Sequence, residues 1–205
     1  MQKLSSLLIT VSGLLFFISA TQAQTEPTPN TPQTALFAGG CFWCIEADFE
    51  KLDGVIEVVS GYTGGSAKTA NYKAVSRTET GHYEAVEVRY DAQKVSYAEL
   101  VEYFWRHIDP TDAQGQFCDK GSSYRSAIFY ADDAQRDTAT NSLRQLQASK
   151  PFKADIVTPI LPAKPFYLAE KYHQDYYKKN PLRYRYYRNG CGRDRRTAEL
   201  WGEND

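Results

Sequence analysis

Methionine is almost absent from this chain of 205 residues, because the only one is Met1. The four cysteines are Cys41, Cys44, Cys118 and Cys191. Cys118 and Cys191 each stand alone, so the paired ligand spacing of a zinc site is missing and no bound metal is expected. A protein that works among oxidants gains from having no methionine to convert into its sulfoxide.

Neither sign of charge is in excess, with 24 Lys and Arg against 25 Asp and Glu. Such a chain lacks the strongly basic surface that nucleic acids and anionic membranes select, so neither is an expected partner. Hydrophobic residues make up 42% of the chain, and aromatic residues make up 14%. This composition supplies the core of a single globular domain, which we expect to be a monomer.

Beyond the N-terminus, no apolar run is long enough to cross a bilayer. The first residues hold a lone Lys3, an apolar run over 7–18 and small residues that end at Ala23. This is the pattern of a secretory signal peptide, so we assign residues 1–23 to one and expect an exported protein. Residues 24–34, QTEPTPNTPQT, are polar and proline-rich and predict a disordered linker.

Removal of residues 1–23 takes away one basic residue and no acid, so the mature charge is 23 − 25 = −2. The mature protein should have no stable membrane association. We expect it in the bacterial periplasm or secreted from the cell.

Strand and helix patterns are interspersed in the rest of the chain. Apolar runs predict strands at 35–40, 55–62, 81–91, 126–131 and 155–160. Helical spacing and capping residues predict helices at 41–54, 96–104, 132–149 and 166–178. The alternating strand suits antiparallel pairing. The pattern therefore predicts an α/β (α+β) two-layer sandwich, a mixed sheet with helices packed on it and a ferredoxin-like core.

The segment GGCFWC, residues 39–44, lies where a strand passes into a helix. Cys41 is thereby predicted at a helix N-terminus, where the unpaired N–H groups favour the thiolate and lower its pKa. Thioredoxin-like enzymes also carry Cys-x-x-Cys at a helix start, so an exported thiol–disulfide oxidoreductase using Cys41 and Cys44 is one alternative. Phe42 and Trp43 would instead build an apolar wall that suits a small apolar substrate group. A disulfide-stapled binding protein is a further alternative.

Glu84 lies in the alternating strand 81–91, on the same face as Val86, Val88 and Tyr90. An edge-strand glutamate near solvent would be the ordinary interpretation. The alternative is a buried carboxyl whose pKa is raised by desolvation, so that it stays protonated and can donate a proton.

Six motifs occur in order along the chain: GGCFWC, SGYTGG, NYKAV, TGHYEAVEVRYD, DKGSSYRSAI and YHQDYYKKNP. Together they resemble the A-type peptide methionine sulfoxide reductases, and the resemblance extends over residues 35–194. It implies an α/β sandwich that reduces the S epimer of methionine sulfoxide, either free or in oxidised proteins. It also implies no bound cofactor and an external dithiol reductant, such as thioredoxin or a thioredoxin-like protein.

The resemblance also implies roles for individual residues. Cys41 would be the nucleophile, and Glu84 the acid that protonates the sulfoxide oxygen. Phe42 and Trp43 would hold the substrate methyl group. Tyr72 and Tyr124 would form hydrogen bonds with the sulfoxide oxygen. Asp119 would help to order the site, and His173 would lie near the pocket.

The thiol that resolves the Cys41 sulfenic acid has two candidates. Cys191, in RNGCGRD, is flanked by glycines, which predicts a mobile loop, and it lies where relatives keep a resolving cysteine. Cys44, where glycine is commonest in the family, is one helical turn from Cys41. We favour Cys191, expect Cys118 to pack in the structure, and assign residues 195–205 to a C-terminal tail. The distal tail cysteine of the family is missing.

Overall fold

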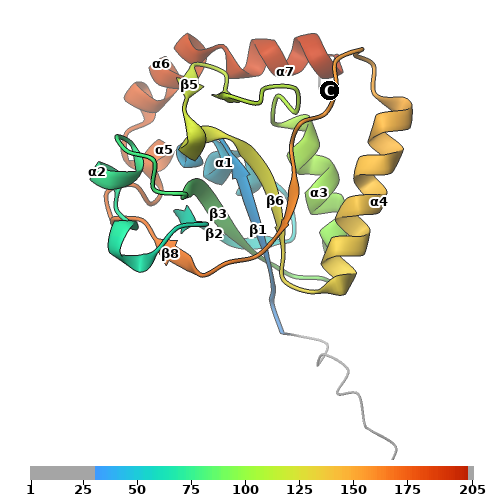
Figure 1. Cartoon of the computed structure of the whole chain (residues 1–205), viewed down its shortest axis with the longest axis horizontal. Helices are drawn as coiled ribbons and strands as arrows, with labels where there is room; N and C mark the ends of the chain where they lie inside the picture. Colours follow the sequence, from blue (N-terminus) through green and yellow to red (C-terminus); the bar gives the residue numbers. More distant parts are fainter. Residues whose placement is uncertain (1–30, 203–205) are drawn as a thin grey trace, which may run out of the picture.

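The computed structural model describes residues 31–202 (Figure 1). The predicted signal peptide, residues 1–23, lies outside the described residues, as do residues 24–30 of the predicted linker. In the described part of the chain, no helix is both long and apolar enough to span a membrane.

A six-stranded sheet forms the centre of the fold (Figure 1). Its strands, in their order across the sheet, are β7 (Ile160–Pro162), β6 (Ser126–Tyr130), β1 (Gln33–Gly39), β3 (Tyr83–Tyr90), β2 (Val55–Thr63) and β8 (Phe166–Leu168). All neighbours pair antiparallel except β6 and β7, which are parallel, so the predicted mixed sheet is confirmed. The inner order β6-β1-β3-β2, with one helix after β1 and one after β3, is the predicted ferredoxin-like core.

Three helices cover one face of this sheet: α1 (Phe42–Phe49), α3 (Tyr97–Arg106) and α4 (Asp133–Ser149). Phe37 of β1 is fully buried beneath them, with its ring centroid 5.0 Å from that of Phe49 and 4.9 Å from that of Phe104. The neighbouring residue Leu36 points to the opposite face, where Phe166 and other side chains cover a smaller apolar cluster. The helices and the sheet thus form the predicted two-layer sandwich.

Two of the predicted helix starts are fixed by capping side chains. The Ser96 hydroxyl accepts a hydrogen bond from the Glu99 N–H at 3.2 Å, and the Glu99 carboxylate accepts one from the Ser96 N–H at 2.8 Å. This capping box begins α3. Asp132 caps α4 by accepting from the Gln135 N–H at 2.8 Å. A cap of this kind stabilises a helix by about 1 kcal/mol.

The predicted helix at 166–178 is wrong. Its first residues form β8, in which Leu168 pairs with Gly61 at the edge of β2. A turn follows, in which Asp175 has a φ of 53°, and only α5 (Tyr176–Lys179) is helical. The aromatic spacing cannot distinguish a helix from a chain held against a sheet edge. The strand predicted at 155–160 is displaced as well, since β7 begins at Ile160.

Two helices that the sequence did not predict lie across one end of the sheet: α6 (Pro181–Cys191) and α7 (Arg193–Trp201) (Figure 1). Polar residues dominate both, so hydrophobic periodicity gives little signal. Arg188 docks α6 on α1 through an ion pair of 2.9 Å with the buried Asp48. Cys191 is the last residue of a helix, so its predicted mobile loop is wrong.

The folded domain extends beyond the predicted boundaries at both ends. β1 begins at Gln33, inside the predicted linker, and the Tyr90 hydroxyl donates to the Gln33 side chain at 3.0 Å. Residues 195–201 of the predicted tail belong to α7, which buries Leu200 and Trp201.

Trp201→Ala should lower the free energy of unfolding by about 3 kcal/mol, as expected for a buried aromatic side chain. The Trp201 ring lies against Phe152 and beneath Arg106, at centroid distances of 5.0 Å and 5.0 Å. Urea unfolding measures this change. Tyr186→Ala is the control, because Tyr186 is 84% exposed and its loss should cost less than about 0.5 kcal/mol. Equal stability of the two variants would contradict the packing of α7.

Candidate active site

Cys41 lies between the end of β1 and the start of α1. Gly40 has a φ of 85°, a conformation that side chains disfavour, and a Cβ on Gly39 would lie 2.5 Å from Ile45. Cys41 is the N-cap residue of α1, so its predicted place at a helix N-terminus is confirmed. The residue is only 5% exposed.

The predicted lowering of the Cys41 pKa is wrong for this state of the protein. Burial raises the pKa of the Cys41 thiol, and the hydrogen-bonded Cys44 side chain adds to the rise. The hydrogen bond with Cys41 in turn lowers the pKa of Cys44 to about 7, helped by the charges of Arg193 and Arg188. The two thiols therefore form a buried pair in which Cys44 ionises more readily.

Glu84 of β3 is buried, with 1% of its surface exposed, in line with the apolar residues of its strand. One carboxylate oxygen accepts a hydrogen bond from the Phe42 N–H at 3.2 Å, and the Tyr124 hydroxyl also bonds to the carboxylate. Burial raises the pKa of Glu84 to about 8. The predicted burial of the Glu84 carboxyl is confirmed, and its pKa is shifted in the predicted direction.

A cavity of about 60 Å³ lies over the start of α1. Its lining consists of Cys41, Phe42, Trp43, Tyr72, Glu84, Asp119, Tyr124 and Tyr187. The structure thus brings together seven of the residues that the resemblance selects. Tyr72 lies on α2 (Tyr72–Val75), Asp119 on β5 (Asp119–Lys120), and Tyr124 on the short 3-10 helix η2 (Ser122–Tyr124). Aromatic rings and one protonated acid suit a small group that is apolar at one end and carries an oxygen at the other.

His173 lies behind the cavity rather than in its lining. Its Nδ1 accepts a hydrogen bond of 3.0 Å from the Trp43 indole N–H, and Tyr176 stacks on Trp43 at a centroid distance of 3.7 Å. Burial lowers the pKa of His173 to about 4, so the ring is neutral at pH 7. Glu170 faces its Nε2 at 4.0 Å and accepts from the Tyr72 N–H at 2.9 Å. His173 therefore holds the Trp43 ring in its position at the cavity.

Tyr187 of α6 is a site residue that the sequence analysis missed. Its hydroxyl donates to the Asp119 carboxylate and also contacts the Cys41 thiol by a hydrogen bond. The only local signal is its position four residues before Cys191, one turn of a helix that hydrophobic periodicity did not reveal.

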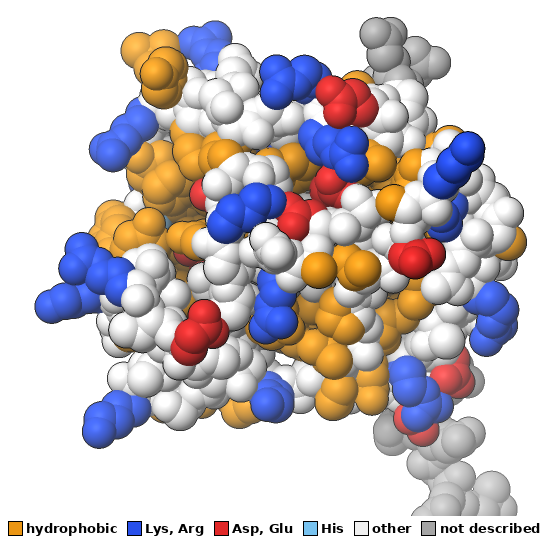
Figure 2. Space-filling view, turned by 45° about the horizontal axis from the view of Figure 1, so that its top comes forward, with side chains coloured by type: hydrophobic (Ala, Val, Ile, Leu, Met, Phe, Trp, Pro, Cys, Tyr) orange, Lys and Arg blue, Asp and Glu red, His pale blue; other side chains and the backbone are white. Residues whose placement is uncertain are grey.

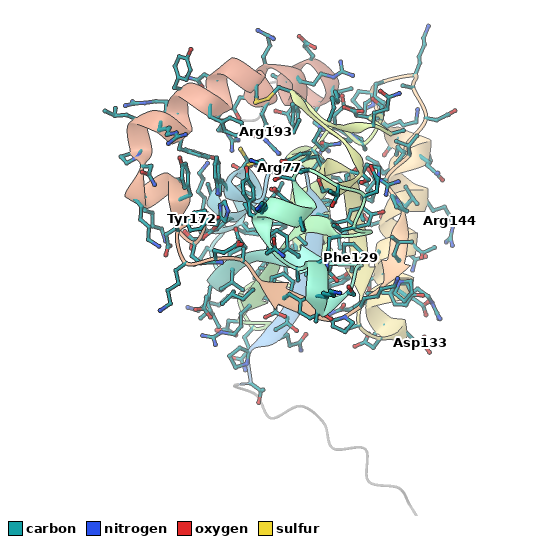
Figure 3. All side chains as sticks on the ribbon, turned by 60° about the vertical axis from the view of Figure 1, so that its left-hand side comes forward. Arg77, Phe129, Asp133, Arg144, Tyr172 and Arg193 are labelled. Atoms are coloured by element: carbon teal, nitrogen blue, oxygen red, sulfur yellow. A yellow bond between two sulfur atoms is a disulfide. The ribbon has the colours of Figure 1, made fainter. Side chains whose placement is uncertain are left out.

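Cys118 and Cys191 are joined by a disulfide, with their Cα atoms 4.8 Å apart, while Cys41 and Cys44 are free thiols. Cys118 is exposed, so the expectation that it packs inside the protein is wrong. Figure 3 shows the disulfide as a yellow bond beneath α6 and α7. Figure 2 shows this end of the molecule turned toward the reader. Hydrophobic side chains form a patch on this surface, and several Asp and Glu side chains lie within it.

The family model of the peptide methionine sulfoxide reductases matches residues 33–205. The chain belongs to this family. Peptide methionine sulfoxide reductase MsrA 2 of Caulobacter vibrioides is 49% identical over 197 residues, which cover 96% of this chain and 98% of that protein. MsrA of Bacillus subtilis is 51% identical over 170 residues, covering 83% and 96%.

The solved structures agree with this assignment. Mxr1 from Saccharomyces cerevisiae in its reduced form is 32% identical, with a TM-score of 0.70, and the match covers 77% of this chain and 91% of that one. The protein is therefore a peptide methionine sulfoxide reductase of the MsrA type, an oxidoreductase with a redox-active cysteine.

Glu84→Gln should flatten the dependence of the reductase's stability on pH. The folded pKa of Glu84, about 8, lies above its usual value, so the folded state keeps a proton that the unfolded chain releases. This contribution to stability is complete at low pH and is lost as the pH rises through about 8. We expect urea unfolding between about pH 5 and 9 to show that the wild type loses more stability than the variant, by roughly a few kcal/mol.

Glu46, whose pKa burial raises to about 7, is present in both proteins and cancels in the comparison. Glu57→Gln, at an exposed side chain, is the control and should follow the wild type. Parallel curves for the wild type and Glu84→Gln would contradict a protonated Glu84.

Proposed function

We propose that this reductase converts the S epimer of methionine sulfoxide, free or in oxidised proteins, to methionine, with Cys41 as nucleophile and Glu84 as acid. The observation that carries the proposal is the shared cavity, in which a helix-start thiol and a buried, protonated carboxyl face the same small space. A sulfoxide needs both groups, because its sulfur is attacked while its oxygen takes up a proton.

The lining supplies a place for each part of the substrate. Phe42 and Trp43 offer apolar surface to the methyl group, while the hydroxyls of Tyr72 and Tyr124 reach the side of the cavity where Glu84 lies. Asp119 orders this side through its hydrogen bond from Tyr187. The chirality at sulfur then decides which epimer presents its oxygen to Glu84.

The chemistry takes place in two stages. The Cys41 thiolate attacks the sulfoxide sulfur, and Glu84 gives a proton to the oxygen. The S–O bond of the substrate then breaks, the hydroxyl passes to the Cys41 sulfur as a sulfenic acid, and methionine leaves. A second thiol then attacks the Cys41 sulfur, and water departs as a disulfide forms. Burial raises the pKa of the Cys41 thiol in the empty site, so Cys41 must lose its proton in the course of the reaction.

Cys44 is the better candidate for this second thiol. The Cys44 thiol forms a hydrogen bond with the Cys41 thiol, and its pKa is about 7. Cys191, which we favoured from the sequence, is instead joined to Cys118 by a disulfide. We therefore propose a Cys41–Cys44 disulfide as the first product of resolution.

An external dithiol would complete the cycle, and no bound cofactor takes part in the scheme. Mxr1 from Saccharomyces cerevisiae has been seen in complex with Trx2, at 22% identity to this chain. A thioredoxin or a thioredoxin-like protein is accordingly the reductant that we propose.

The alternative function is an exported thiol–disulfide oxidoreductase that uses Cys41 and Cys44. Exchange with a protein disulfide requires one cysteine to be open to a partner protein. Cys41 is 5% exposed and Cys44 is 2% exposed, which disfavours this alternative.

Assays with dithiothreitol and each methionine sulfoxide epimer test the proposal. The wild type should reduce the S epimer and leave the R epimer, and Cys41→Ser should lose all turnover. Glu84→Gln should lower kcat about 10²–10⁴-fold, the usual contribution of a general acid. Reduction of the R epimer, or turnover by Cys41→Ser, would contradict the proposal.

We propose further that residues 1–23 direct export to the bacterial periplasm, where the mature enzyme works as a monomer free of the membrane. The apolar run and the small residues before Ala23 support this proposal. Expression of the full chain in a Gram-negative host should yield periplasmic protein whose N-terminus lies near Gln24, and deletion of 2–23 should retain it in the cytoplasm. An uncleaved cytoplasmic product of the full chain would refute export, and gel filtration reports the oligomeric state.

A further inference from the structure

A second hollow adjoins the cavity over Cys41. Its volume is about 220 Å³, against about 60 Å³ for the cavity, and its lining consists of residues 75–79 and 120–124. Tyr124 belongs to the lining of both spaces. We call this hollow the side groove. The part of a substrate that extends beyond the cavity therefore has the side groove next to it.

Each wall of the side groove is continuous with a tyrosine of the cavity. One wall contains the end of α2, whose first residue is Tyr72, and the other wall contains η2, whose last residue is Tyr124. Both tyrosines line the cavity, and both are assigned above to the sulfoxide oxygen. A peptide chain that leaves the cavity between these two tyrosines therefore enters the side groove.

Hydrogen bonds within the protein hold both walls in place. The Asn71 side chain accepts from the Ala74 N–H at 3.0 Å, and the Thr78 hydroxyl donates to the Ala74 carbonyl at 2.8 Å. The Ser122 hydroxyl donates to the Glu79 carboxylate at 2.5 Å and so joins one wall to the other. The side groove is thus formed before a substrate arrives, which lowers the entropic cost of binding in it.

Three charged side chains line the side groove, and only one of them is available to a ligand. Glu79 accepts the hydrogen bond from Ser122, and Lys120 forms an ion pair with Asp112. Arg77 is exposed, and within residues 31–202 no ion pair or hydrogen bond engages its guanidinium group. A guanidinium group can donate two parallel hydrogen bonds to a carboxylate, so this is the ligand chemistry that the groove favours.

We propose that the side groove is a binding subsite for the polypeptide next to the oxidised methionine, and that Arg77 selects substrates with a carboxylate beside that residue. The carboxylate can belong to an Asp or Glu side chain or to the C-terminus of the oxidised chain. This inference rests on the proposed function. Arg77 determines specificity through a neighbour of the reacting residue and takes no part in the chemistry.

A set of short peptides measures this preference. Each derives from acetyl-Ala-Ala-MetO-Ala-Ala-amide, in which MetO is the S epimer of methionine sulfoxide. Glu, Gln or Lys replaces the alanine before or after MetO, and a further peptide ends in a free carboxylate after MetO-Ala. With dithiothreitol as reductant, the carboxylate of Glu or of the C-terminus should raise kcat/KM about threefold over the matched neutral peptide, as for an exposed ion pair. Lys should lower it.

Variants of the mature enzyme assign the preference to Arg77. Arg77→Gln should remove the preference for the acidic peptide, and Arg77→Lys should restore part of it. The ratio of kcat/KM between two peptides within one variant cancels any general change in catalysis. Arg144→Gln is the control, because it removes the same charge from an exposed position on α4, on the other side of the molecule from α2 (Figure 3). This control should keep the wild-type ratio.

Three results would overturn the subsite: equal kcat/KM for the acidic and neutral peptides in the wild type, a preference for Lys, or a preference that Arg77→Gln retains. A preference that about 0.5 M NaCl leaves intact would also contradict it, because salt screens exposed charges. The neutral peptide separates this failure from that of the proposed function. A wild type that cannot reduce the neutral peptide overturns both, whereas one that reduces all the peptides equally overturns the subsite alone.

Discussion

The hydrogen bond between the Phe42 N–H and the Glu84 carboxyl is the interaction on which the site depends. It joins the first turn of α1 to the middle of the sheet across 42 residues of sequence, at a distance of 3.2 Å. A helix start has N–H groups without partners in the helix, and a buried carboxyl needs donors. Here the Phe42 N–H supplies the donor that the Glu84 carboxyl needs, and the carboxyl supplies the acceptor that the N–H lacks within the helix. As a result, the nucleophile and the acid are positioned by backbone elements rather than by loops.

Around this bond, burial sets the chemistry more strongly than the helix end does. The pKa of Glu84 rises because its strand places it among apolar neighbours, and the pKa of Cys41 rises for the same reason. A helix N-terminus alone would favour the Cys41 thiolate. In the buried cavity, desolvation is the larger effect on Cys41, while the hydrogen bond with Cys41 and two nearby guanidinium groups lower the pKa of Cys44.

The sequence predicts the elements whose signals are local. The capping box at Ser96, the alternation through Glu84 and the glycines before Cys41 each specify structure within a few residues, and the structure agrees with them. The errors lie where distant contacts decide. The aromatic segment after Phe166 follows the edge of β2, and α6 is held by the pairing of Arg188 with Asp48, 140 residues away. Neither partner can be identified from periodicity, so Tyr187 and the Cys118–Cys191 pairing stayed hidden.

The small volume of the cavity also has a consequence for the proteins that this enzyme would repair. A space of about 60 Å³ has room for the end of one side chain and for no main chain. An oxidised residue must therefore protrude from its own protein, on a loose loop, at a terminus or from an unfolded region. Damage inside a well-packed client becomes reachable only when that client opens, so the client's own local stability governs how soon its oxidised core is restored.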